Sequence, residues 1–446
     1  MRYTYRDIEY NLALVYGFLG TMPVIAVRNL TVFSWLSLVY VLCFFLSLIN
    51  GKVRFSKFCI PYLLITIFNN ITALICTRSD IPQIWKNQQK VGVVWNILYL
   101  LLIIYYSSSS NRFLSKAYLK GVYYASITHM FWGFLQYILF NIWGIKLNDV
   151  VFVDVLHMST ESITQIKGNG IALTGLCWNA GNMAPLLIFG FAMTQSLPLK
   201  FCFVIVALLS GSRTAILGMI TYIVLLYIIT PNKFKISERT WKIVIYIFVA
   251  GMIPLIITGK IGDIFTTIIK NFSSLSRKTL TSESSAIIHL RYLTSIFSVA
   301  GYAGIIKLLF GFGINCSGFP FTILYNQFNT VGFGTWVVEC DIINQLWSTG
   351  LIALFIRYAW YYKYIKRAFK VDKKTFCFFV AFLIEGLAYN VTFNWSFIMI
   401  VAMFIVLRDN EIVSDIVMEK IHHKGKIYSL KNNNYLRERK HINNVN

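Results

Sequence analysis

Long apolar runs recur along almost all of this chain, and they restrict its fold more than any other feature. A helix needs about 20 apolar residues to cross a bilayer. Of all residues, 57% are hydrophobic and only 13% are charged, whereas soluble proteins carry about 25% charged residues. The pattern predicts an all-α polytopic membrane protein with about twelve membrane-spanning helices and both chain ends on one side. The predicted spans are residues 11–27, 30–49, 58–76, 91–106, 118–142, 179–195, 198–209, 214–230, 241–257, 342–361, 375–389 and 393–407.

The basic residues predict which side of the membrane each connecting segment faces. The formal net charge is +23, but the lysines and arginines lie in short segments between apolar runs. This is the distribution of the positive-inside rule, and it places both termini in the cytoplasm. It argues against nucleic acid as a partner, because no basic soluble module is present. The cytoplasmic groups are Lys52, Arg54 and Lys57; Arg112, Lys116 and Lys120; Lys233, Lys235, Arg239 and Lys242; and Lys363, Lys366, Arg367, Lys370, Lys373 and Lys374.

The same pattern divides the chain into four parts. Residues 1–257 form a transmembrane bundle with an external loop at 142–178, and residues 342–410 add the last transmembrane helices. Between them, 258–341 form one long external loop. Apolar residues from Ile261 to Leu275 recur at helical spacing in this loop, which predicts an amphipathic helix lying in the membrane interface. Residues 411–446 form a basic cytoplasmic tail that we expect to be disordered.

The apolar stretch 198–230 contains the most informative group in the chain, Arg213. As one helix this stretch would extend for about 50 Å, more than the roughly 30 Å hydrocarbon core. It forms either one steeply tilted helix or two short helices broken at Ser210, Gly211 and Ser212. Two helices keep all basic loops on one side, and they place Arg213 at the external face. A guanidinium there either holds an anion such as a phosphate, assisted by the two serines, or only caps the end of a span.

Other external ionisable groups could cooperate with Arg213. Arg291 and His289 lie in the long loop, and Glu339 and Asp341 lie just before a span. Two arginines could hold a lipid-linked pyrophosphate while one carboxylate takes a proton from an attacking hydroxyl. The alternatives are a solvated Arg291 and acids that only complement a helix dipole.

Three further observations limit the chemistry. The sequence has no His/Cys cluster with metal-ligand spacing, and we expect no metal and no cofactor. Cys316 and Cys340 form either a disulfide or two unpaired thiols. His129, inside an apolar run, predicts a packed, hydrogen-bonded histidine.

Four motifs, in this order, resemble the O-antigen polymerase and O-antigen ligase superfamily of bacterial envelope glycosyltransferases. They are GNGIALTGLCWNAGN at 168–182, SGSRTA at 210–215, HLRY at 289–292 with FGFG at 310–313, and ECDIINQLWSTGL at 339–351. The resemblance covers about residues 168–351. The ligase branch has a histidine where this chain has Glu339, which favours the polymerase branch.

The resemblance implies a GT-C-like fold and a metal-independent, inverting transferase of the bacterial inner membrane. It would move a growing glycan from undecaprenyl pyrophosphate to the non-reducing-end sugar of another lipid-linked repeat unit, at the periplasmic face. Arg213 and Arg291 would hold the pyrophosphate, and Glu339 or Asp341 would be the base. A chain-length regulator protein is the implied partner, besides membrane lipid. The alternatives are a ligase that passes the glycan to a lipid A core and a polysaccharide flippase.

Overall fold

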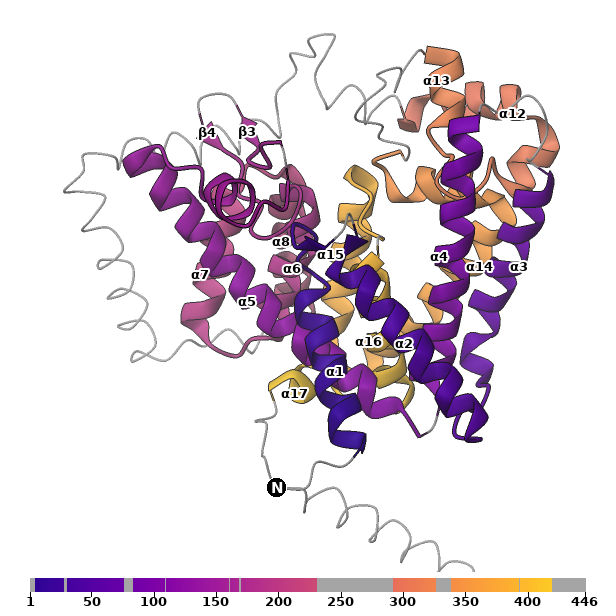
Figure 1. Ribbon diagram of the computed structural model, residues 1–446, viewed down its shortest axis with the longest axis horizontal. Helices are drawn as coiled ribbons and strands as arrows, with labels where there is room; N and C mark the ends of the chain where they lie inside the picture. Colours follow the sequence, from indigo (N-terminus) through magenta and orange to yellow (C-terminus); the bar gives the residue numbers. More distant parts are fainter. Residues whose placement is uncertain are drawn as a thin grey trace, which may run out of the picture.

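The computed structural model describes residues 5–27, 30–75, 83–108, 110–159, 161–167, 170–230, 292–325, 338–392 and 394–418. These residues are mostly helical, as expected for an all-α fold (Figure 1). Two short antiparallel pairs, β1 (Ala26–Val27) with β2 (Leu30–Thr31) and β3 (Ile166–Lys167) with β4 (Gly170–Ile171), are the strands among them. The helices of the bundle are α1 (Tyr5–Leu19), α2 (Val32–Ile49), α3 (Ile60–Ile75), α4 (Gln83–Ser107), α5 (Arg112–Trp143), α6 (Ala180–Met193), α7 (Leu197–Leu209), α8 (Arg213–Ile229), α14 (Asp341–Val371), α15 (Lys373–Ala388) and α16 (Asn394–Arg408).

A helix overlaps each predicted span that falls in the described residues, and the span at 241–257 lies outside them. Two helices, Val32–Ile49 and Trp85–Ser107, are long and apolar enough to cross a membrane by the usual length and hydropathy test. The first helix begins earlier than its predicted span. It accommodates Glu9 because the hydroxyl of Tyr105 donates a hydrogen bond to the Glu9 carboxylate, and it ends before Gly20 and Pro23.

Close backbone approaches at glycines hold the bundle together. Gly17 of α1 faces the backbone of Tyr118 in α5, and Gly121 of α5 faces the backbone of Leu14 and Phe18 in α1. Helices in a bilayer associate through such small-residue contacts, because lipid provides little hydrophobic drive for helix pairing. The α1–α5 pair is therefore closely packed, and α6 and α16 pack against α5. Figure 1 shows α1 and α5 side by side.

The stretch 198–230 is broken into two helices, as the alternative with two short helices predicted. Gly190 of α6 lies against Phe203 of α7, as in a hairpin, so α7 returns antiparallel to α6. Gly211 has φ +67, a value that favours glycine. The start of α8 and the start of α6 consequently lie at the same end of the bundle, where the backbone N–H of Leu173 donates to the carbonyl of Ser210 (3.2 Å).

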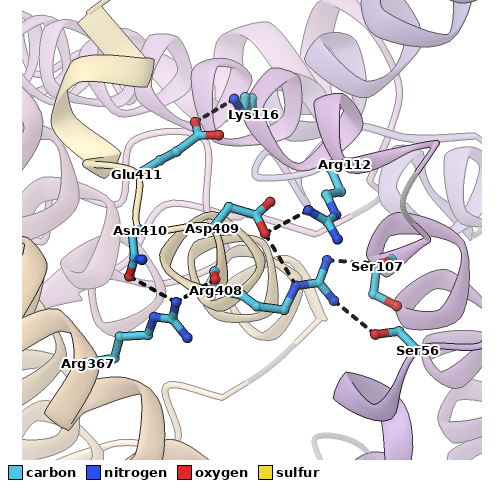
Figure 2. A network of polar contacts seen from close by, with 9 residues as sticks. All are labelled: Ser56, Ser107, Arg112, Lys116, Arg367, Arg408, Asp409, Asn410 and Glu411. Carbon is cyan, nitrogen blue, oxygen red and sulfur yellow. Dashed lines mark hydrogen bonds and ion pairs between the residues drawn. The ribbon is translucent and has the colours of Figure 1, made fainter. Parts of the chain in front are cut away.

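A polar network closes the opposite end of the bundle (Figure 2). Arg408, at the end of α16, donates to Ser56 Oγ (3.0 Å) and to the Ser107 carbonyl (3.1 Å). Arg112, at the start of α5, pairs with Asp409 (2.8 Å). The network also contains the ion pair Lys116–Glu411 and the hydrogen bonds of Arg367 to the Arg408 carbonyl and to Asn410. These contacts tie together chain segments that are far apart in sequence.

The predicted long external loop contains two described helices, α12 (Ile296–Phe310) and α13 (Phe319–Tyr325). Pro320 is the second residue of α13. In the first turn of a helix the backbone N–H that proline lacks has no partner within the helix. These helices share a hydrophobic cluster with the first part of α14, including Tyr292, Val338, Cys340 and Trp347. The amphipathic stretch 261–275 lies outside the described residues.

Two glycines interrupt helices at this cluster. Gly304 in α12 and Gly350 in α14 have positive φ, and Gly350 (φ 78) breaks α14 where its backbone meets that of Leu309 and Phe310. The N–H groups of Phe312 and Gly313 donate to the carbonyls of Trp347 and Ser348 there. The segment 341–349 is therefore separate from the long helical part that follows it.

Three smaller expectations can be compared with the structure. Cys316 and Cys340 are buried free thiols. His129 is buried and accepts a hydrogen bond from the Leu176 N–H (3.1 Å), as predicted for a packed histidine. The tail expected to be disordered begins with a helix, α17 (Val413–Met418), because Val413 and Val417 are buried against the bundle; residues 419–446 lie outside the described part.

Candidate functional site

The turn between α7 and α8 presents Arg213 at the surface. Ser210 Oγ donates to the Ala207 carbonyl and accepts from the Ser212 N–H. Ser212 Oγ caps α8 by accepting from the Ala215 N–H, and it also pairs with the Thr214 hydroxyl. Both serines are buried, whereas Arg213 is exposed. The two predicted anion ligands Ser210 and Ser212 thus use their hydroxyls within the turn.

Arg213 is available to an anion. Within the described ranges, its guanidinium has no hydrogen bond, ion pair or ring contact. It stands at the N-terminus of α8, where backbone N–H groups and the helix dipole add to its positive charge. The turn can therefore attract a phosphate or carboxylate group.

Glu339 lines a pocket of about 280 Å³ at the same end of the bundle as Arg213. Four parts of the fold build the walls: the link from α1 to α2 with the start of α2, the start of α6, the residues just before α14, and the link from α15 to α16 with the start of α16. Its lining residues are Gly20, Pro23, Thr31, Phe33, Trp178, Asn182, Glu339, Tyr389, Asn390, Asn394 and Trp395.

Tyr389 lines the same pocket as Glu339 and contacts the start of α6. The Asn179 side-chain amide donates to the Tyr389 hydroxyl (2.7 Å), and the Tyr389 ring packs on Gly181. A tyrosine phenol ionises only near a pH of about 10. The phenol of Tyr389 therefore stays neutral and keeps an O–H donor beside the pocket.

Asp341 lies near Glu339 in sequence but in a different environment. Its side chain is 3% exposed and accepts hydrogen bonds from both the backbone N–H and the hydroxyl of Thr392. Burial raises the pKa of Asp341, while these hydrogen bonds and the charge of Arg357 oppose the shift in part. Asp341 thus holds the start of α14 against the link between α15 and α16.

The helix that carries Arg213 packs against both helices whose ends build the pocket. Gly218 of α8 lies against Ile188 of α6 and Glu385 of α15. Arg213 precedes Gly218 by five residues, so it lies about 7.5 Å further along α8, toward the end that bears the pocket. The structure thus brings Arg213 and the two acids to one end of the bundle, and it shows no direct contact between them in the described segments.

The other two predicted residues, Arg291 and His289, lie outside the described residues. Tyr292, which follows Arg291 in sequence, is buried against Phe321 with ring centroids 5.1 Å apart. It belongs to the same hydrophobic cluster as Val338 and Cys340, the two neighbours of Glu339. The cluster therefore ties the sequence neighbours of Arg291 and Glu339 together.

Two buried ionisable residues were missed by the sequence analysis. Glu385 is 0% exposed, and neither of its carboxylate oxygens finds a hydrogen-bond partner in the part of the chain that the structure describes. Arg357 is 7% exposed and lies over the ring of Phe397 (5.6 Å). Each is a charged residue inside an apolar run, a signal that marks functional candidates in membrane proteins.

A metal centre finds no support among the described residues, where no three His, Cys, Asp or Glu side chains gather in a possible metal site. The chain was also compared with known proteins. No protein-family model matches it, and no match was found among curated protein sequences. The function of the chain is therefore inferred from the residues of the site itself.

Proposed function

We propose that this chain is an integral inner-membrane polymerase of a bacterial surface polysaccharide. It transfers a growing glycan from undecaprenyl pyrophosphate to a sugar hydroxyl of another lipid-linked repeat unit, on the external side. One observation carries the proposal: Glu339 lines a pocket beside the two helices that pack against the Arg213 helix. A proton acceptor and an anion-binding cation are the two groups that this transfer needs.

The proposed reaction proceeds in one displacement. The acceptor hydroxyl oxygen forms a bond to the anomeric carbon of the donor glycan, and Glu339 accepts the hydroxyl proton. The bond from that carbon to the pyrophosphate oxygen breaks, and the lipid pyrophosphate leaves with the electron pair. Arg213 stabilises the charge that develops on the leaving group. Attack opposite the leaving group inverts the anomeric centre.

The environments of the two acids support Glu339 as the base. Glu339 lines the pocket, whereas Asp341 is buried and already accepts two hydrogen bonds from Thr392. A base must reach the proton that it accepts. We assign to Asp341 a positioning role, and to Ser210 and Ser212 the shaping of the turn that presents Arg213. Arg291 remains a proposed pyrophosphate ligand through the family resemblance alone. His289 remains a proposed ligand because it is an ionisable residue two positions before Arg291 in the same loop.

The test uses the full-length protein in nanodiscs with lipid-linked repeat units isolated from cells that lack this gene. We expect a ladder of longer lipid-linked glycans without any energy source. The substitution Arg213→Ala should reduce lengthening by about 100-fold or more. Arg54→Ala replaces an exposed arginine at the opposite end of the bundle, and it should lengthen the glycans as the wild type does.

Other results of the same assay would identify a ligase or a flippase. Transfer only to a lipid A core acceptor, with no lengthening of lipid-linked glycan, would identify a ligase. Movement of the lipid-linked unit across the membrane with no new glycosidic bond would identify a flippase. A normal ladder from the Arg213→Ala protein would refute the role of this cation.

A further inference from the structure

The long second part of α14 presents a stripe of exposed aromatic side chains. Phe355 is 74% exposed and Tyr362 is 66% exposed, and Phe369 continues the stripe. Because successive members are seven residues apart, they lie on one side of the helix. Another side of the helix faces the bundle, where Tyr364 stacks on Phe404 of α16 with ring centroids 4.6 Å apart. From Phe355 to Phe369 the stripe extends for about 21 Å along the outside of the bundle.

Three exposed lysines of α14 lie beside the Phe369 end of this stripe, and they are Lys363, Lys366 and Lys370. Spacings of three and four residues place them on one face of the helix, with neighbouring Cβ atoms about 5–6 Å apart. None of the three forms an ion pair with a residue that the structure describes. Like charges at this spacing repel each other. These residues, the α14 lysine face, therefore attract a negatively charged group.

Three acids near this face are already engaged elsewhere. Asp372, which follows α14, accepts hydrogen bonds from the backbone N–H and the hydroxyl of Thr375 and from the N–H of Val413 (3.3, 2.7 and 3.0 Å). Asp409 and Glu411 pair with basic residues of α5. The charge of the α14 lysine face is thus not balanced by these acids.

A hydrogen bond fixes the level of the α14 lysine face along the bundle. Arg367, which lies between two of the lysines in sequence, donates to the carbonyl of Arg408 at the end of α16 (2.6 Å; Figure 2). The apolar helix α16 therefore ends level with the lysines. Under the proposed topology this level is the cytoplasmic boundary of the hydrocarbon core, where phospholipid head groups lie.

Phe369 is held in a fixed position at this boundary. Its ring packs against Phe376 of α15 with centroids 5.0 Å apart, and Lys373 Nζ lies 3.4 Å from its centroid. The side chain is still 43% exposed. Tyr362, at the other border of the lysines, belongs to a residue type that is enriched at the head-group level of membranes. Apolar and positively charged groups are thus presented side by side on one helix.

An anionic phospholipid matches both parts of this surface. Its phosphate and acidic head group can pair with the lysines, whose apolar stems let their charged ends reach the interface. One of its acyl chains can lie along the aromatic stripe. A free phosphate would use the lysines alone, and an acidic cytoplasmic protein would not reach the part of the stripe inside the bilayer. The continuity of the stripe with the lysines therefore favours a lipid.

We propose that the α14 lysine face and the stripe from Phe355 to Phe369 bind an anionic phospholipid of the cytoplasmic leaflet. The three lysines contact its head group, and an acyl chain packs along the aromatic side chains. The proposal requires that the chain spans a membrane, but it does not depend on glycan transfer.

The test measures lipid retention by the purified full-length protein in a neutral detergent, using native mass spectrometry. The wild type should retain phosphatidylglycerol about tenfold or more above phosphatidylcholine, because several lysines contact the head group. The combined substitutions Lys363→Gln, Lys366→Gln and Lys370→Gln should bring the two lipids within about twofold of each other. Circular dichroism of each variant establishes that it is folded.

A matched control removes the same charge at the same end of the bundle. Lys52→Gln, Arg54→Gln and Lys57→Gln change exposed residues of the link from α2 to α3, where Ser56 contacts Arg408. This triple variant should keep the selectivity of the wild type. An equal loss of selectivity in both triple variants would show diffuse attraction by net charge, and it would overturn the proposal.

The stripe is tested in the same way. Phe355→Ala combined with Tyr362→Ala should weaken phosphatidylglycerol retention by about fivefold or more, because the acyl chain loses apolar contact area. Leu42→Ala combined with Phe45→Ala, at exposed positions of α2, is the control and should retain the lipid as the wild type does. Unchanged retention by the α14 pair would count against the lipid.

Three further results would also overturn the proposal. The first is equal retention of the two lipids by the wild type, and the second is wild-type selectivity in the variant without the three α14 lysines. The third is displacement of phosphatidylglycerol by a large excess of glycerol 3-phosphate or of a poly-glutamate peptide, which would indicate a site for free phosphate or for an acidic protein.

Discussion

Replacing Gly121 by alanine tests how closely α1 and α5 approach each other. A Cβ atom at this position would lie 2.8 Å from the Phe18 nitrogen and 3.0 Å from the Leu14 carbonyl carbon. The Leu14 carbonyl oxygen would lie closer still. Non-bonded heavy atoms prefer separations of about 3.5–4.0 Å, so α1 would have to move by roughly 1.5 Å or more. The obstacle is backbone, which cannot rotate away as a side chain can. Overpacking of this kind costs about 1–3 kcal/mol.

The assay is the apparent melting temperature of the purified protein in detergent. We expect Gly121→Ala to lower it by several degrees, and Gly17→Ala to do the same because its Cβ would lie 2.9 Å from the Tyr118 carbonyl carbon. One separation of the helices relieves both clashes, so the double variant should lose less stability than the sum of the single variants. Gly301→Ala, a helical position with nothing within 4 Å, is the matched control. A Gly121→Ala protein that melts with this control would refute the close approach.

Three further predictions concern the buried polar groups. Asp341→Asn should retain glycan lengthening. Asp341→Ala should lose about 1–3 kcal/mol of stability, because this substitution leaves both donors of Thr392 unpaired. Loss of lengthening in a stable Asp341→Asn protein would contradict the positioning role of Asp341. Glu385→Gln should melt within a few degrees of the wild type, since a carboxyl that is buried without a hydrogen-bond partner in the described segments is expected to be neutral already. A large loss of stability would reveal an essential charge. Arg408→Ala should lower the melting temperature more than Arg54→Ala does, because the Arg408 side chain joins the end of α16 to Ser56 and to Ser107. Equal melting temperatures for the two variants would refute the importance of the polar network of Figure 2.

Local composition was enough to predict the helices and the break before Arg213. Apolar runs define helices in a membrane because every backbone polar group must be satisfied within the segment. The break was predictable because Ser210, Gly211 and Ser212 combine conformational freedom with side chains that can cap a helix.

The assignment of the two acids depended on tertiary contacts. Glu339 and Asp341 are two residues apart and chemically alike, and no local rule distinguishes them. The hydrogen bonds of Asp341 come from Thr392, 51 residues away. Similarly, Gly350 has a positive φ where its backbone meets that of Leu309. A glycine within a helical pattern does not by itself predict a break. Glu385 and Arg357, in contrast, could have been found as lone charges in apolar runs.

In the network of Figure 2, the basic residues of α5 are synthesised long before the acids with which they pair. Arg112 is synthesised 297 residues before its partner Asp409. Under the proposed topology, Arg112 and Lys116 therefore emerge from the ribosome unpaired, and their full charge is present while the early helices take their orientation in the membrane. The acids Asp409 and Glu411 are synthesised only after α16, and their ion pairs then stabilise the orientation that the earlier helices already have.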